Sequence, residues 1–236
     1  MNTEIIIEVL PSYFNGAILT LQLLGVALLF GLILAVPLGI ARASNNKFLS
    51  WPVWAYTYVI RGTPMLVQLF LIYFGLAQFA AVRDSVFWPW LSSAWFCAVL
   101  AFTLNTAAYT AEIIAGAIRA IPAGEVEAAK SLGLSRWQVL SRIVLPAGMR
   151  RALPAYSNEV IMMLHGTSLA STVTLVDLTG AAREMNARFY LPFEAFITAG
   201  IFYLALTGIL VGVFHLAEKR WLRHLAPRQL RDAVVI

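Results

Sequence analysis

Cysteine is almost absent from this chain, and charged residues are scarce. Only one cysteine, Cys97, occurs in 236 residues, and it lies in an apolar stretch. A single thiol excludes a disulfide within the chain and a cysteine-based metal site. Charged residues make up 12% of the sequence, hydrophobic residues make up 60%, and the mean hydropathy is +0.77. A soluble domain needs more polar surface than this, so the composition indicates an integral membrane protein.

Motifs for nucleotide hydrolysis and for other enzyme chemistry are also missing. The sequence contains no Gly-x-x-x-x-Gly-Lys-Ser/Thr phosphate loop, so we do not expect it to bind ATP by that motif. Ser157, Glu159 and His165 offer hydrolase residue types without an activating motif, so a membrane enzyme is disfavoured and no catalytic residue is assigned. No histidine lies at metal-ligand spacing, so no metal or cofactor is expected in this chain.

Charge-free intervals predict an all-α, polytopic membrane protein with five transmembrane helices. About 20 apolar residues are needed to cross the ~30 Å hydrocarbon core as a helix. The predicted spans are residues 16–41, 62–82, 90–117, 153–176 and 195–217. A polar segment, about 118–151, separates the third and fourth spans. We therefore predict a single transmembrane domain over residues 1–236, with its two termini on opposite sides of the membrane.

Lysine and arginine collect on one side of this predicted topology. Thirteen fall on the side of segment 118–151, three fall on the other side, and Arg61 lies at a membrane boundary. The thirteen are Arg42, Lys47, Arg119, Lys130, Arg136, Arg142, Arg150, Arg151, Lys219, Arg220, Arg223, Arg228 and Arg231. Because cytoplasmic loops carry the excess of basic residues, we place segment 118–151 and the C-terminus in the cytoplasm and the N-terminus outside. The net charge of +5 then needs no nucleic acid partner.

The polar segment 118–151 predicts a short helix that ends in a glycine turn. Pro122 can open the helix at a first-turn position, and Glu125 and Glu127 place negative charge near its N-terminal end. Gly133 suits the left-handed residue that closes such a helix. The chain is therefore expected to bend at Gly133.

A second short helix is predicted directly after that bend. Ser135, followed three residues later by Gln138, has the spacing of a capping box. The capping box opens a helix over about 136–144, which Pro146 is expected to end. The segment should therefore offer a structured helical pair to a soluble partner.

One pattern in this segment resembles the cytoplasmic coupling loop of binding-protein-dependent ABC importers. It consists of Glu127, Ala128 and Ala129, then Gly133, then Ile143, Leu145 and Pro146. The resemblance implies a coupling helix that docks on a separate ABC ATPase dimer, which would bind ATP and Mg. We assign Glu127, Ala128, Ala129 and Gly133 to this coupling role. The small side chains of the last three would let a docking groove approach the backbone closely.

Three further segments are similar to the membrane subunits of type I importers for polar amino acids. They are Arg61–Pro64, Leu104–Tyr109 and Ala155–Val160, and the resemblance covers about residues 16–221. It is strongest to the histidine/lysine/arginine/ornithine group. It implies a multi-pass subunit of the bacterial inner membrane, a periplasmic amino acid binding protein, and a second, similar permease subunit, more in keeping with a heterodimer than a homodimer. Many relatives have Lys-Asp-Ser-Ser where this chain has His165–Ser168, so a Lys/Asp charge pair is absent here.

Charged and polar residues inside the predicted spans are candidates for substrate binding. Glu159 lies more than one turn inside the fourth span, where it can face a substrate cation or pair with Arg61 or with backbone donors. The other candidates are Asn105, Tyr109, Glu112 and Ser168. The first three of these share one face of the third span, where they line the pathway or pack against a neighbouring helix. Glu112 can equally be an interface residue near the cytoplasmic end.

An ATP-driven importer of basic amino acids is the function we predict. A carboxylate at Glu159 without a neighbouring Lys/Asp pair favours arginine, ornithine, lysine or histidine as cargo. The alternatives are another polar amino acid, such as glutamine, and an ion-coupled secondary transporter. The secondary transporter is less favoured because five spans cannot divide into two equal repeats.

Overall fold

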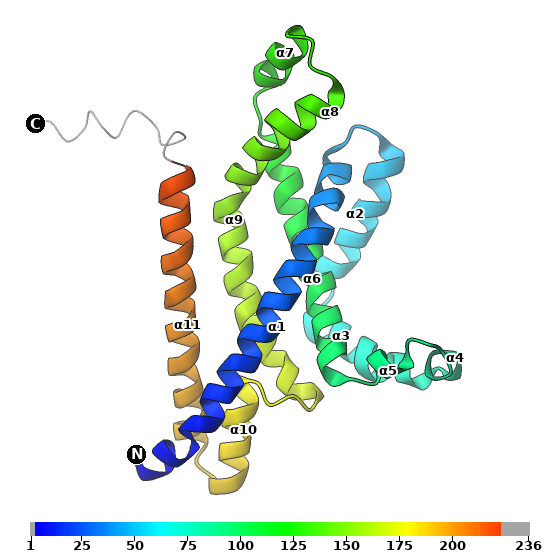
Figure 1. Ribbon diagram of the computed structural model, residues 1–236. Helices are drawn as coiled ribbons and strands as arrows, with labels where there is room; N and C mark the ends of the chain where they lie inside the picture. The colour runs from blue at the N-terminus through cyan, green and yellow to red at the C-terminus, as the bar shows by residue number, and fades with distance from the viewer. Residues whose placement is uncertain (1–2, 223–236) are drawn as a thin grey trace, which may run out of the picture.

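A computed structural model describes residues 3–222 of this chain as an elongated bundle of helices (Figure 1). The α-helices are α1 (Thr3–Ala43), α2 (Lys47–Gly62), α3 (Met65–Phe70), α4 (Ala80–Arg83), α5 (Trp88–Leu91), α6 (Ala94–Arg119), α7 (Ala123–Ser131), α8 (Arg136–Val139), α9 (Leu145–Gly166), α10 (Leu178–Phe189) and α11 (Pro192–Trp221). Four tighter or wider segments join them: the π-helical turns η1 (Leu71–Gly75) and η3 (Leu140–Val144), and the 3-10 segments η2 (Leu76–Gln78) and η4 (Thr167–Val173).

The all-α membrane architecture predicted from the sequence is confirmed. By length and apolar composition α1, α6 and α11 can each cross a membrane, and two bent helix pairs raise the number of candidate spans within residues 3–222 to as many as five. The N-terminal end of α1 lies beside α10 at one end of the bundle, and α7 and α8 form the opposite end (Figure 1). Arg223, Arg228 and Arg231, which contribute to the predicted charge asymmetry, lie outside the described residues.

The core forms where α1 crosses α6 and both meet α9 and the α3 region. Its largest fully buried side chains include Leu23, Phe102 and Leu164. At Gly39 of α1 a Cβ atom would lie 2.7 Å from the side chain of Ile114 on α6. Helices that approach this closely need small residues at the contact, as is usual in membrane bundles.

The predicted second span, 62–82, is not one helix. Helix α2 runs earlier in the chain and ends at Gly62, and the next helical stretch starts at Met65 after a bend of 102°. Thr63 and Pro64 adopt extended backbone between them. Proline has no N–H to donate and excludes the α conformation for the residue before it, so the helix breaks here.

The sequence predicted that Pro146 ends the second helix of the polar segment, and this prediction is wrong. Helical backbone continues from α8 through η3 and α9 to Val173. Pro146 lies in the first turn of α9, directly after the π-helical turn η3. The wider turn accommodates a proline that would otherwise clash with the carbonyl group of Arg142. The helix that contains most of the predicted fourth span, 153–176, therefore begins earlier, on the side of the loop.

Candidate substrate cavity and coupling loop

A cavity of about 770 Å³ opens where the break after α2 faces α6 and α9. Its wall includes the polar side chains Arg61, Asn105, Tyr109, Asn158, Glu159 and His165. Bending of the chain after Gly62 places Arg61 at this wall, because α2 and α3 diverge there. Three of the five candidate substrate residues, Asn105, Tyr109 and Glu159, are brought together in one cavity.

Glu159 is the buried carboxylate of this cavity. It projects from α9 and is only 9% exposed. Among the side chains that the structure describes, the ion pairs are Arg42–Glu112, Arg151–Glu125 and Arg188–Glu8, so Glu159 takes part in none of them. An unpaired charge inside a membrane bundle is costly, and residues of this kind usually serve a pathway. Its carboxylate is therefore available to a cationic ligand.

Tyr109 and Arg61 hold each other at the cavity wall. The guanidinium carbon of Arg61 lies 5.1 Å from the centroid of the Tyr109 ring. The Tyr109 hydroxyl also donates a hydrogen bond, at 3.5 Å, to the carbonyl oxygen of Arg61. A cation over an aromatic ring is attracted by the negative face of the ring. Tyr109 thus positions the last turn of α2 relative to α6.

Asn105 is part of a hydrogen-bond network that fixes the break after α2. Its side-chain amide donates to Gln68 Oε1 at 3.0 Å. Gln68 in turn donates to the carbonyl oxygen of Ile60 at 2.6 Å and to Thr63 Oγ1 at 2.8 Å. The amide nitrogen of Asn105 is therefore engaged in packing, although the residue lines the cavity.

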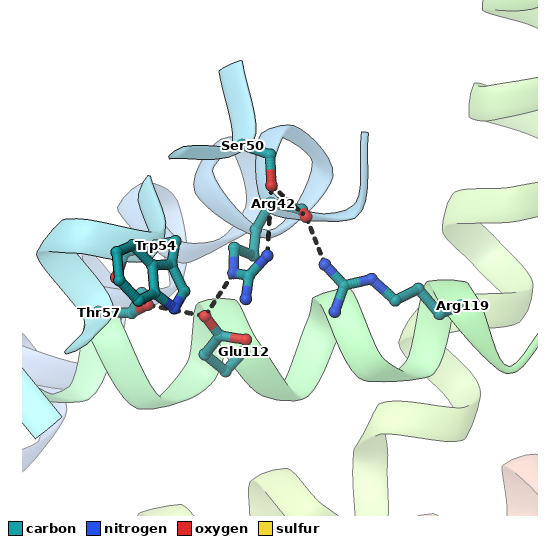
Figure 2. Close-up of polar contacts among 6 residues, drawn as sticks. All are labelled: Arg42, Ser50, Trp54, Thr57, Glu112 and Arg119. Carbon is teal, nitrogen blue, oxygen red and sulfur yellow. Dashed lines mark hydrogen bonds and ion pairs between the residues drawn. The ribbon is translucent and has the colours of Figure 1, made fainter. Parts of the chain in front are cut away.

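Glu112 lies outside this cavity, in a polar cluster at the end of α1 (Figure 2). Its Oε1 atom accepts hydrogen bonds from Arg42 Nε at 2.7 Å and from Thr57 Oγ1 at 2.7 Å. Arg42 also donates to Ser50 Oγ at 3.2 Å, and its carbonyl oxygen accepts a hydrogen bond from Arg119. The cluster joins α1, α2 and α6, so Glu112 makes a structural contact here.

Ser168 is also not in the cavity wall. It lies in the 3-10 segment η4, and its carbonyl oxygen accepts a hydrogen bond from Ser171 Oγ at 2.9 Å. The neighbouring His165 does line the cavity, and its Nε2 atom lies 3.1 Å from Thr207 Oγ1 of α11.

The predicted coupling loop has the bent helical form that the sequence predicts. Gly133 adopts a left-handed backbone with φ of +80°. Ser135 and Gln138 form both hydrogen bonds of the capping box, at 3.3 Å and 2.8 Å. Pro122, however, is the residue before the first helical turn of α7 and not a member of it. A proline there still suits a helix start, because its missing N–H is not needed.

The four residues assigned to coupling differ in their exposure. Glu127, Ala128 and Gly133 are exposed, whereas Ala129 is only 5% exposed and packs inside the loop. Ala129 therefore supports the loop from within and does not offer surface to a partner.

Two large apolar side chains on the loop were not among the predicted coupling residues. Leu132 is 81% exposed and Trp137 is 72% exposed. Exposed apolar residues of this size in an otherwise polar segment are candidates for contact with a partner. Their occurrence within the polar segment 118–151 was the signal in the sequence that could have revealed them.

Comparison with known proteins connects this geometry to one family. The family described as "Binding-protein-dependent transport system inner membrane component" matches residues 27–224. The histidine/lysine/arginine/ornithine transport system permease protein of Escherichia coli (strain K12) is 48% identical over 215 residues, which are 91% of this chain and 90% of that protein. The nopaline transport system permease protein of Agrobacterium fabrum (strain C58) is 45% identical over 219 residues, which are 92% of this chain and 91% of that protein.

Solved structures agree with this relationship. The crystal structure of an amino acid ABC transporter with histidines superposes with a TM-score of 0.81 at 32% sequence identity, over 91% of this chain and 96% of that chain. An inward-facing methionine ABC transporter superposes with a TM-score of 0.67 at 19% identity, which shows the shared fold. On the match over residues 27–224 and these identities, the chain belongs to the inner membrane components of binding-protein-dependent transport systems.

Proposed function

We propose that Glu159 of this permease subunit receives the side-chain charge of a basic amino acid during ATP-driven import. One observation carries the proposal: Glu159 is a buried carboxylate, free of ion pairs within residues 3–222, in a cavity of about 770 Å³. A carboxylate in this position favours a cation over the neutral side chain of glutamine. The similarity to a permease named for histidine, lysine, arginine and ornithine supports the same cargo.

Energy for transport comes from a separate subunit, because the family comprises the membrane components of such systems. This assignment excludes the ion-coupled secondary transporter. In the cycle we propose, an ABC ATPase dimer binds ATP and Mg and docks on the loop of α7 and α8. The exposed Leu132 and Trp137 offer it an apolar contact surface. A periplasmic binding protein delivers the amino acid at the opposite end of the bundle.

We further propose that the subunit works beside a second, similar permease subunit in a heterodimer, in the bacterial inner membrane. Its N-terminus is periplasmic and its C-terminus is cytoplasmic in this arrangement. The excess of lysine and arginine on the side of the α7–α8 loop supports the orientation. Motion of the loop would then switch the helices between outward-facing and inward-facing states.

The substitution Glu159→Gln tests the cation site. Breaking one partner of a buried charge pair costs about 3–5 kcal/mol, so uptake of L-arginine and L-histidine at limiting concentration should fall by about 100-fold or more. Uptake is measured in proteoliposomes that contain the purified complex, the binding protein and ATP. The matched control is Glu184→Gln, which makes the same chemical change at an exposed position of α10.

Expression, assembly and nucleotide-driven ATPase activity should be unchanged in both variants. If Glu159→Gln complexes import L-arginine and L-histidine at wild-type rates, the carboxylate is structural. Selectivity would then belong to the second permease subunit or to the binding protein.

A further inference from the structure

We propose that Arg61 binds the α-carboxylate of the transported amino acid, at the wall of the cavity that contains Glu159. The inference rests on the proposed function of Glu159 and extends it. With this contact, the membrane subunit itself can distinguish an amino acid from a simple amine that carries the same side chain.

The cavity presents one negative and one positive group that do not neutralise each other. Arg61 and Glu159 both line it, yet neither belongs to an ion pair within the part of the chain that the structure describes. If their roles were only structural, pairing them would be the simplest way to offset the cost of two charges in the bundle. A basic amino acid carries two positive groups and one carboxylate, so it can satisfy both residues at once.

Arg61 is held in position before any ligand arrives. Its guanidinium group lies over the ring of Tyr109, and the Tyr109 hydroxyl bonds to its carbonyl oxygen. Directly after Arg61 the chain breaks at Thr63, which Gln68 ties to α6 through Asn105. A guanidinium group matches a carboxylate with two parallel N–H···O bonds, and little entropy is lost when the group is already ordered.

Glu112, the other carboxylate near Arg61, is already paired. Arg61 also lines a neighbouring hollow that contains Glu112. Glu112, however, accepts hydrogen bonds from Arg42 and Thr57 at 2.7 Å each. With that carboxylate paired, the remaining acidic group among the side chains that line either hollow is Glu159. The exposed guanidinium group is therefore free to bind a ligand carboxylate.

Ligands that differ only in the α-carboxylate test the proposal. L-arginine and agmatine share the guanidinium side chain and the amine, and agmatine lacks the carboxylate. Binding of each is measured by calorimetry to the complete permease–ATPase complex in nanodiscs, without the binding protein, and with the second permease subunit wild-type throughout. The wild-type complex should bind L-arginine more tightly than agmatine.

In the Arg61→Gln complex, affinity for L-arginine should fall about 10- to 100-fold, because a hydrogen bond to a charged group contributes about 1.5–3 kcal/mol. Affinity for agmatine should stay the same. Arg61→Lys, which keeps the charge but loses the planar fork, should retain part of the preference. Glu159→Gln should weaken both ligands, because both carry the side-chain cation.

The possible outcomes separate the two hypotheses. If Arg61→Gln weakens L-arginine and agmatine equally, Arg61 is structural and the proposal fails. If the substitution strengthens both, Arg61 competes with the ligand for Glu159, which also overturns it. If Glu159→Gln changes neither affinity, the proposed cation site fails while the result for Arg61 still stands. Should the Arg61 variants not assemble, the wild-type complex decides: equal affinity for L-arginine and its methyl ester overturns the proposal.

Discussion

Two carboxylates on the inner helices, Glu112 and Glu159, have opposite surroundings. Glu112 pairs with Arg42, which lies 70 positions earlier in the sequence, whereas Glu159 has no ion-pair partner among the described residues. The sequence identified both as candidates, because a charge inside a span needs either a partner or a function. It could not distinguish them, since the partner of Glu112 is set by the crossing of α1 and α6. The sequence could therefore identify the two carboxylates as candidates, but it could not predict which of them is paired.

At this scale we predict that Glu112→Gln lowers stability without changing selectivity. The substitution removes the charge that Arg42 and Thr57 bind, and hydrogen bonds to charged groups contribute about 1.5–3 kcal/mol. The complex in detergent should therefore unfold at a lower temperature, as measured by the fluorescence of its tryptophans. Thr57→Val, which leaves the ion pair in place, should have the smaller effect. A changed preference between L-arginine and L-glutamine in the Glu112→Gln complex would contradict the structural role.

Some helix boundaries could be predicted from a few neighbouring residues of the sequence, and others could not. The capping box at Ser135 and the left-handed glycine at position 133 were predicted correctly, because both depend on a few neighbouring residues. The two prolines were harder to interpret. Pro64 interrupts a predicted span, and Pro146 lies inside continuous helix after a π-helical turn. Whether a proline breaks a helix depends on how the surrounding bundle satisfies the freed backbone groups, which the local sequence does not contain.

At the scale of the element, the bend between α7 and α8 should tolerate only residues that accept positive φ. Gly133 has φ of +80°, and no neighbouring atom would meet a Cβ atom there within 4 Å. Asparagine adopts left-handed backbone readily, so Gly133→Asn should keep most transport. Gly133→Trp strains the backbone and places a bulky group on the exposed loop, so it should abolish ATP-driven uptake while the permease subunits still assemble.

Two measurements check this prediction. Copurification of the ATPase reports on assembly, and ATP-dependent uptake of L-arginine in proteoliposomes reports on transport. Normal binding-protein-stimulated ATPase activity and transport in the Gly133→Trp complex would remove the coupling assignment. A severe defect in Gly133→Asn, equal to that of tryptophan, would show that steric access and not backbone conformation limits this position.

For the whole molecule, composition predicts an all-helical membrane protein, and the proposed orientation rests on the distribution of lysine and arginine. The long apolar intervals predict membrane helices because backbone groups in lipid must bond within their own segment. The cavity was not predictable in the same way. It depends on the 102° bend after α2 and on the approach of α9, which bring together residues about 100 positions apart in sequence.

The orientation predicts which side of the membrane each loop faces. A cysteine introduced at Ser135, between α7 and α8, should be labelled only by reagents that reach the cytoplasm. A cysteine at Ser85, between α4 and α5, should react with impermeant maleimide added to the outside of intact cells with a permeabilised outer membrane. The native Cys97 is buried and should give little background, which the unsubstituted protein checks. The reverse labelling pattern would place the α7–α8 loop outside and contradict the proposed topology.

The uninterrupted helical backbone from Arg136 to Val173 has a mechanical consequence. At 1.5 Å per residue, Glu159 lies roughly 35 Å along this rod from the start of α8. A push on the α7–α8 loop can therefore reach the cavity through a single continuous helix, without passing through a chain of side-chain contacts. The π-helical turn η3 is the one place along this rod where each turn holds more residues than in an α-helix. If that turn were to lose one residue and become α-helical, the part of the helix that follows it would rotate by about 100°. This rotation is enough to carry Glu159 from the cavity wall to another face of the bundle.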